Sequence, residues 1–145
     1  MKVGSFCNRD PVTVRRDTEI REAARSMRTH HVGALVVVDG GRPVGIVTDR
    51  DLVIEVLAGD VSDDKLTIGD VMTQDVGVIE EDEGFSEALV KMAELGARRL
   101  PVVDARGHLV GMVSLDDILE CYAELTDRLR SVLGQELWRE TYRRR

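Results

Sequence analysis

Two short segments of the chain combine residue types that can hold a phosphorylated sugar. They are residues 45–51 (GIVTDRD) and 111–117 (GMVSLDD), and each has a glycine, two apolar residues, a hydroxyl residue and, three positions later, an aspartate. A strand pattern leads into each copy and a helix pattern leads out, which puts Thr48 and Ser114 at helix N-termini. The free amides of a helix N-terminus suit a phosphate. A carboxylate in the first turn can accept both hydroxyls of a ribose, and phosphate plus ribose implies a nucleotide.

The same residues have a purely structural interpretation. Thr48 and Ser114 are good N-caps, and Asp51 and Asp117 stand at the third helical position, which is a capping-box variant that needs no ligand. Three features favour a ligand. A glycine precedes each cap and lets another group approach the backbone closely. Both copies use Asp where a capping box favours Glu or Gln, and both fall at the same place in a duplicated unit.

The duplication extends well beyond the two motifs. Many residues of the first half match the residue 65 positions later, and after the turn at residues 39–42 the offset becomes 66. Two copies of about 60 residues are too few for a solenoid and predict a pseudo-twofold pair. The clearest matches are Asp17 with Asp82, Glu22 with Glu87, Ala23 with Ala88, Met27 with Met92, Leu35 with Leu100, Val37 with Val102, Val47 with Val113 and Asp51 with Asp117.

Hydrophobic periodicity predicts the same elements in both copies: strand, helix, strand, strand, helix. In the first copy we expect a strand at 11–14, a helix beginning at Asp17 or Thr18, a buried strand at 35–38, a hairpin turn at 39–42, a strand at 43–47 and a helix at 49–57. The fold class is therefore α/β (α+β). Because each repeat alone would be marginally stable, we expect the two to share a core.

The C-terminus has no counterpart in the first repeat. Ile118, Tyr122, Leu125, Leu129 and Val132 alternate at spacings of four and three, which predicts an apolar seam on an extended helix. We expect Gly134 to break this helix, whereas Leu137, Trp138 and Tyr142 continue its apolar character. The predicted organisation is a first repeat at 1–66, a second repeat at 67–125 and a helical tail at 126–145.

Composition excludes several classes of protein. The net charge of −7 over 145 residues argues against general nucleic-acid binding, including an interpretation of the terminal arginines as a nucleic-acid tail. Cys7 and Cys121 form no metal-ligand cluster, so we expect no metal site. The absence of a signal peptide and of a long apolar run predicts a cytoplasmic protein with no membrane contact.

The sequence resembles a tandem pair of cystathionine-β-synthase (CBS) domains, a Bateman module, over about residues 6–125. The two motifs match the ribose-phosphate segment of that family, and residues 32–39 (VGALVVVD) and 98–104 (RRLPVVD) match its central strand. The resemblance implies two repeats packed head to tail with two clefts between their sheets. Each cleft is expected to hold one adenosyl ligand, commonly AMP, ADP, ATP or S-adenosylmethionine.

The resemblance also implies which residues line the clefts. One cleft would use Gly111, Ser114 and Asp117, with the adenine against Val12, Thr13 and Val14; the other would use Gly45, Thr48 and Asp51, with the adenine against Val76, Gly77 and Val78. Arg98 and Arg99 stand where the family places basic phosphate contacts, although they could also be a solvated pair. The first repeat has Gly33 and Ala34 there, and an acidic run follows the second adenine strand. These departures argue against equal occupancy of the clefts and against a triphosphate in the Thr48 cleft.

No constellation of side chains with catalytic spacing is present. Asp116 and Asp117 are neighbours on a helix and diverge by about 100°. The resulting hypothesis is a non-catalytic sensor of an adenosyl ligand, with a role in energy sensing, that signals through its shape or assembly. The alternative is a ligand-independent interaction scaffold. Bateman modules pair into flat dimers through the helices of each repeat, so the resemblance also implies a homodimer. The output is expected to pass through a further protein partner, which is unknown. We expect the tail to contribute to the dimer contact or to fold back on its own repeat.

Overall fold

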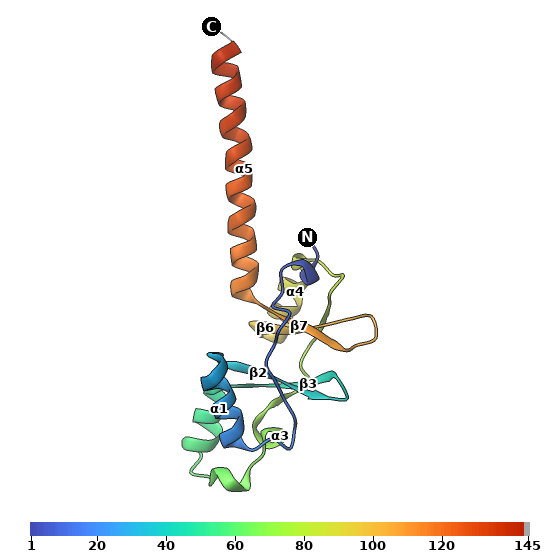
Figure 1. Cartoon of the computed structure of the whole chain (residues 1–145), viewed down its shortest axis with the longest axis vertical. Helices are drawn as coiled ribbons and strands as arrows, with labels where there is room; N and C mark the ends of the chain where they lie inside the picture. Colours follow the sequence, from blue (N-terminus) through green and yellow to red (C-terminus); the bar gives the residue numbers. More distant parts are fainter. Residues whose placement is uncertain (144–145) are drawn as a thin grey trace.

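The computed structural model describes residues 1–143, apart from the side chain of Glu140, and shows a two-lobed body from which one long helix projects (Figure 1). Arg144 and Arg145 of the predicted arginine tail lie outside the described residues. In chain order the elements are η1 (Val3–Ser5), β1 (Thr13–Val14), α1 (Ile20–His30), β2 (Ala34–Asp39), β3 (Arg42–Thr48), α2 (Asp49–Asp51), η2 (Leu52–Leu57), η3 (Asp63–Lys65), α3 (Ile68–Val71), β4 (Thr73–Gln74), β5 (Ile79–Glu80), α4 (Phe85–Leu95), β6 (Arg99–Val103), β7 (Leu109–Ser114) and α5 (Leu115–Arg143). The predicted mixed fold of two similar units with a C-terminal helix is confirmed.

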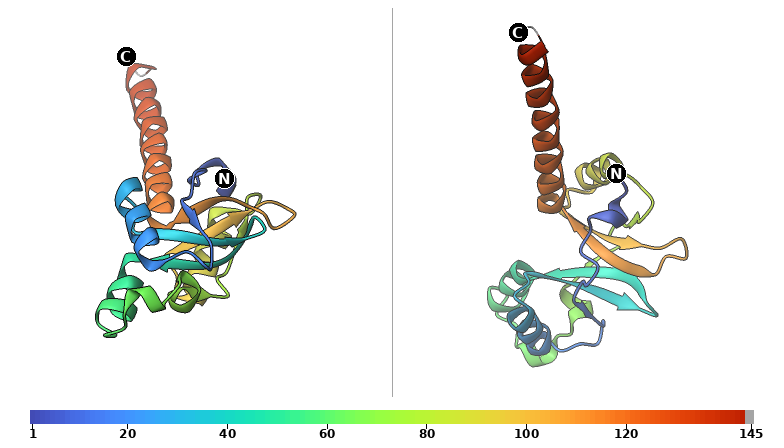
Figure 2. Two further views of the ribbon diagram at one scale, coloured as in Figure 1. Left: turned by 60° about the horizontal axis from the view of Figure 1, so that its bottom comes forward. Right: turned by 45° about the horizontal axis from the view of Figure 1, so that its top comes forward.

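Each lobe contains one sheet built around an antiparallel hairpin. The first sheet has the order β1-β2-β3-β4 and the second β5-β6-β7. The predicted hairpin turn joins β2 to β3, and Gly40 and Gly41 supply its two positive φ angles of 56° and 77°. In Figure 2 the two hairpins lie one above the other, with the helices on the outer sides of the sheets. The pseudo-twofold relation between the repeats is therefore visible in the arrangement of the hairpins.

The outer strand next to each motif comes from the other repeat. In the first sheet Thr73 of β4 pairs with Ile46 of β3. In the second lobe Asn8 of the N-terminal segment pairs with Met112 of β7 in the equivalent way. Each sheet is therefore completed by a segment that leads into the opposite repeat.

The same exchange shapes the core, which is not one shared core as expected but two. The first core contains Ile68, Val71 and Met72, which lead into the second repeat. The second core contains Val3 and Cys7, which lead into the first. Burial raises the pKa of the Cys7 thiol, so this side chain stays neutral and packs as a small apolar residue. Each repeat is stabilised by a segment of the other, because neither hairpin with its two helices buries enough surface alone.

α1 begins at Ile20, two or three residues after the predicted start at Asp17 or Thr18. The N-cap is Glu19, because the Thr18 hydroxyl instead accepts a hydrogen bond from the Arg15 amide at 3.0 Å and stabilises the preceding turn. From there Ile20, Ala23 and Met27 are buried on one face, as their spacing predicts. A hydroxyl residue near a helix start can either cap the helix or accept a hydrogen bond within the turn before it, and the neighbouring sequence does not determine which of the two forms.

The two helices that follow the motifs are unlike each other. The last three residues of the first motif form α2, which passes directly into the π-helix η2, so the predicted helix at 49–57 exists with a wider winding. After the second motif α5 continues for 29 residues, about 43 Å, without interruption at Gly134. The predicted break is wrong, because a glycine inside a helix keeps its backbone hydrogen bonds and costs only about 1 kcal/mol relative to alanine.

Candidate functional site

Both motif aspartates form a capping box with the preceding hydroxyl residue. The Thr48 amide donates to Asp51 Oδ2 at 2.8 Å, and the Asp51 amide donates to Thr48 Oγ1 at 3.2 Å. The Ser114 amide donates to Asp117 Oδ2 at 2.7 Å, and the Asp117 amide donates to Ser114 Oγ at 3.1 Å. Within the described residues, no hydrogen bond reaches Oδ1 of either aspartate. Each carboxylate therefore uses one oxygen for the helix and leaves the other available.

A third capping box shows what the motif looks like without a cleft. The Thr67 amide donates to Asp70 Oδ2 at 2.8 Å at the start of α3. This pair has the same residue types and spacing as Thr48 and Asp51, but it lines neither of the two clefts described below. Capping geometry alone therefore does not identify a ligand site, and the distinguishing feature of the motif copies is the cavity beside them.

Thr48 lines a cleft of about 320 Å³ to which both repeats contribute. Of the residues predicted for this cleft, Thr48, Val76 and Gly77 line it, and Gly45, Asp51 and Val78 do not. Of the two arginines predicted as phosphate contacts, Arg99 lines it and Arg98 does not. Its volume lies at the lower end of the range of small-molecule sites. The remaining lining residues are Ile46, Thr73, Asp75, Leu95, Gly96, Ala97 and Leu100.

Ser114 lines a second cleft, of about 210 Å³, which again combines both repeats. Gly33, Ala34, Arg99, Ser114 and Asp117 of the predicted set line this cleft. Val12, Thr13, Val14 and Gly111 do not; Val14 is buried in the first core, and Val12 packs against that core. The other lining residues are Asn8, Val32, Met112 and Asp116.

The motif glycines lie against protein and not against a cavity. A Cβ on Gly45 would stand 2.6 Å from Met72 Sδ and 2.9 Å from the Thr73 carbonyl oxygen. A Cβ on Gly111 would stand 2.8 Å from Cys7 Sγ and 2.7 Å from the Asn8 carbonyl oxygen. The group that approaches each glycine is thus the crossing segment of the other repeat.

Some of the lining residues that the sequence interpretation missed are related by the internal repeat. Thr73 in one cleft corresponds to Asn8 in the other, Ile46 to Met112, and Ala97 to Val32. Once one cleft is known, the offset of 65 or 66 finds the partner residues in the other. For these three pairs a sequence signal was present, but it needed the position of one cleft as a starting point.

The two adjacent arginines occupy different environments. Arg98 Nη2 lies 4.0 Å from Asp116 Oδ1, both side chains are strongly exposed, and Arg98 lines neither cleft. Arg99 lines both clefts and forms no ion pair with any of the side chains that the structure describes. Only Arg99 is therefore placed to contact an anion in a cleft.

The site geometry agrees with a comparison to known protein families. The model of the CBS domain matches the chain twice, at residues 3–58 and 68–124. The chain belongs to the CBS domain family. Its two matches flank residues 59–67, so this protein is a CBS pair, the tandem arrangement that the duplicated motif predicts.

Three similar proteins place this CBS pair in context. It is 40% identical over 121 residues to the uncharacterized protein MK0525 of Methanopyrus kandleri, covering 83% of this chain and 62% of that protein. It is 37% identical to the inosine-5'-monophosphate dehydrogenase of Methanocaldococcus jannaschii, covering 77% of this chain but only 22% of that enzyme. The CBS domain pair of protein MJ0100, solved in complex with 5'-methylthioadenosine and S-adenosyl-L-methionine, superposes with a TM-score of 0.75 at 31% identity, covering 86% of this chain and 97% of that one.

Two further observations concern membrane spans and metal-ligand groups. Within residues 1–143, no helix is long and apolar enough to cross a membrane. The same residues contain no group of three or more His, Cys, Asp or Glu side chains that could hold a metal ion. The polar groups available in the clefts are hydroxyls, carboxylates, one amide and one guanidinium, which are groups that bind a ligand by hydrogen bonds and charge.

Proposed function

We propose that this CBS pair is a non-catalytic regulatory module that senses an adenosyl ligand, such as AMP, ADP, ATP or S-adenosylmethionine, in its two clefts. The observation that carries the proposal is that each motif hydroxyl lines a cleft built from both repeats. The adenosyl ligands of the MJ0100 domain pair support this ligand class.

In this proposal the second motif aspartate serves the helix and the ligand at once. Oδ2 of Asp117 caps the helix, and its Oδ1 accepts hydrogen bonds from the ribose hydroxyls in the Ser114 cleft. Asp51 caps its helix in the same way but does not line the Thr48 cleft. The hydroxyl of Thr48 donates to the phosphate or to the ribose, whereas the hydroxyl of Ser114, which donates to Asp117 Oδ2, accepts a hydrogen bond from a ribose hydroxyl. Val76 and Gly77 provide an apolar surface for the adenine in the Thr48 cleft.

The proposed signal follows from the shared construction of the clefts. A ligand that touches both repeats prefers the relative orientation of the repeats that fits it best, and it can shift an equilibrium only through such a difference in affinity. We therefore propose that a change of shape or assembly carries the signal to a protein partner, with the cytoplasm as the site of action.

A homodimer is part of the proposal. The outer face of the first lobe exposes Val53, Ile54 and Leu57 on η2, and the second lobe exposes Leu89 and Val90 on α4. Exposed apolar groups on both lobes, together with the seam of α5, provide surface for a second copy of the chain. Nothing in this arrangement requires a membrane or a nucleic acid.

A thermal-shift screen tests the ligand proposal. AMP, ADP, ATP, S-adenosylmethionine and 5'-methylthioadenosine are each added at millimolar concentration, with guanosine monophosphate as a base-exchanged control. A ligand at one hundred times its dissociation constant stabilises the fold by about 2.7 kcal/mol. For a chain of this size we expect a rise in Tm of roughly 5–10 °C. If no adenosyl compound raises the Tm, the alternative of a ligand-independent scaffold is correct.

A further inference from the structure

Arg99 is a single cation placed between two potential ligands. Among the described residues it is the only lysine, arginine or histidine that lines either cleft, and it lines both. The corresponding position of the first repeat, 65 residues earlier, is Ala34, which is buried and carries no charge. The internal repeat therefore supplies two clefts with one guanidinium.

The fixed charges around the clefts are unequal. In addition to Arg99, the lining of the Thr48 cleft contains one carboxylate, that of Asp75. The Ser114 cleft has two, Asp116 and Asp117, and Asp49 stands beside its rim, with Oδ2 3.1 Å from the Cβ position of Gly33. Arg98 offsets Asp116 only in part, because the 4.0 Å pair is exposed. Without Arg99 the Ser114 cleft is therefore the more acidic of the two.

We infer that the two clefts prefer ligands of different charge and are coupled through Arg99. An anionic adenosyl ligand such as AMP binds first in the Thr48 cleft, where its phosphate engages the guanidinium. The Ser114 cleft, then left with its carboxylates, takes a neutral or cationic adenosyl ligand. A second anionic ligand would have to bind in the Ser114 cleft with no free guanidinium to pair with, and it would be repelled by the carboxylates of Asp116 and Asp117. This inference rests on the proposed function, since it assigns a charge class to each of the proposed sites.

Isothermal titration calorimetry on the full chain tests this inference with three adenosyl probes. AMP carries a phosphate of about two negative charges at neutral pH, 5'-methylthioadenosine is neutral, and S-adenosylmethionine is cationic at its sulfonium. We expect one strong AMP site per chain and a second site whose affinity is at least about tenfold lower. This difference corresponds to one charge-assisted hydrogen bond, which the phosphate makes in the first site and lacks in the second. After saturation with AMP, 5'-methylthioadenosine or S-adenosylmethionine still binds at the second site.

Two variants identify the residue responsible. Arg99→Ala should weaken the strong AMP site by about ten- to a hundredfold, and it should change 5'-methylthioadenosine affinity far less, by about threefold or less, because that ligand has no phosphate for the guanidinium. Arg98→Ala is the matched control, because it removes the neighbouring guanidinium, which lines neither cleft, and it should change AMP affinity by less than about threefold. Equal effects of the two substitutions would overturn the special role of Arg99.

A third variant identifies the cleft. Ala97 lines only the Thr48 cleft, so Ala97→Phe should remove the strong AMP site and leave one site for 5'-methylthioadenosine. Persistence of strong AMP binding would overturn the assignment of the anion to this cleft. If 5'-methylthioadenosine binds twice and AMP binds twice with equal affinity, the inference fails and the proposed function stands. If no probe binds, both fail.

Discussion

At the residue scale, the two oxygens of each motif aspartate are in different situations. Oδ2 of Asp117 accepts hydrogen bonds from the amide and the hydroxyl of Ser114, whereas no described group donates to Oδ1. Asp70 has the same capping role at α3, with no cleft beside it. The chain thus contains an internal comparison between a capping aspartate that lines a cleft and one that lines neither cleft.

Asp117→Ala and Asp70→Ala exploit this comparison. Each substitution removes a carboxylate from a first helical turn, so each should lower the free energy of unfolding by roughly 1 kcal/mol. Only Asp117→Ala should also weaken the binding of an adenosyl ligand in the Ser114 cleft, because the ribose hydroxyls lose their hydrogen-bond acceptor. Chemical denaturation measures the first effect and calorimetry with 5'-methylthioadenosine the second. If both variants bind this ligand like the wild type, Asp117 is only a cap.

The residues of the clefts could be predicted only in part from the sequence. Thr48 and Ser114 could be predicted because they belong to the repeated motif, and Arg99 because it lies in the segment that resembles the central strand of the family. All three line the clefts. Asp75 and Leu95 were not found, because they reach the Thr48 cleft through the packing of segments distant from its motif. Their types are ordinary, and only the tertiary structure gives them a position.

At the element scale, the exchanged segments explain why each motif begins with glycine. Gly45 and Gly111 are buried where a strand or segment of one repeat crosses the hairpin of the other. The sequence indicated a close approach at these glycines, but it could not say whether a ligand or the chain itself approaches. In the structure the approaching atoms belong to residues 7–8 and 72–73. The glycine of the motif therefore stabilises the pairing of the repeats.

Gly111→Ala should destabilise the protein by about 1–3 kcal/mol, because its Cβ would overlap the Asn8 carbonyl oxygen and Cys7 Sγ. Gly134→Ala is the control: it lies in α5, nothing outside its chain neighbours and the nearby helix backbone lies within 4 Å of its Cβ position, and it should stabilise the helix by up to about 1 kcal/mol. Denaturant midpoints measure both changes. Equal, small effects would mean that the crossing segment yields easily and that the tight contact at Gly111 is not needed.

Local patterns predicted most elements, and the exceptions have identifiable causes. The hairpin at residues 39–42 and the buried face of α1 follow from turn chemistry and apolar spacing, and both are present. The start of α1 at Ile20 was missed, because a hydroxyl residue such as Thr18 can either cap the helix or stabilise the turn before it. The continuation of α5 through Gly134 was missed, because a single glycine does not end a helix. The two separate cores were missed because exchange between repeats leaves no local signal.

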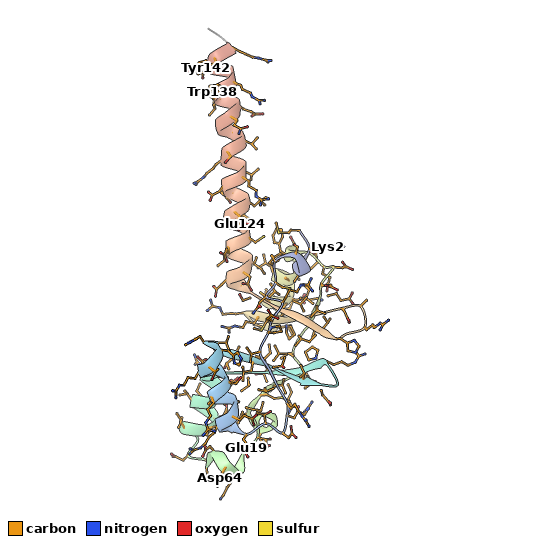
Figure 3. All side chains as sticks on the ribbon, viewed as in Figure 1. Lys2, Glu19, Asp64, Glu124, Trp138 and Tyr142 are labelled. Carbon is orange, nitrogen blue, oxygen red and sulfur yellow. The ribbon has the colours of Figure 1, made fainter. Side chains whose placement is uncertain are left out.

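At the scale of the whole molecule, α5 is the feature that the CBS body does not explain. Ile118 is buried against the second lobe, but Leu129, Val132 and Leu133 are more than half exposed. Figure 3 shows Glu124 near the level at which the helix leaves the body, and Trp138 and Tyr142 close to its far end. The helix therefore does not fold back on its own repeat. Successive helical residues are rotated by about 100°, so Trp138 lies on the opposite side of the helix from Leu129.

The seam of α5 predicts a homodimer that depends on the tail. A projecting helix with an apolar stripe gains stability when a second copy covers the stripe, and a twofold pair covers both stripes at once. Sedimentation or light scattering at tens of micromolar should therefore give twice the mass of the chain, with and without adenosyl ligand. Truncation after Glu124 removes Leu125 and all that follows, and it should shift the equilibrium towards monomer.

A pair of point variants separates the seam from the helix as a whole. Leu129→Glu places a charge on the stripe and should weaken the dimer by at least about tenfold, since an unpaired carboxylate would have to be buried. Ser131→Glu, on the exposed face about 160° away, keeps the stripe intact and should leave the dimer unchanged. A monomeric wild type would refute the dimer. A dimer that tolerates both the truncation and Leu129→Glu would instead pair through the outer helices of the two lobes, as the family resemblance implies, with α5 left free for another partner.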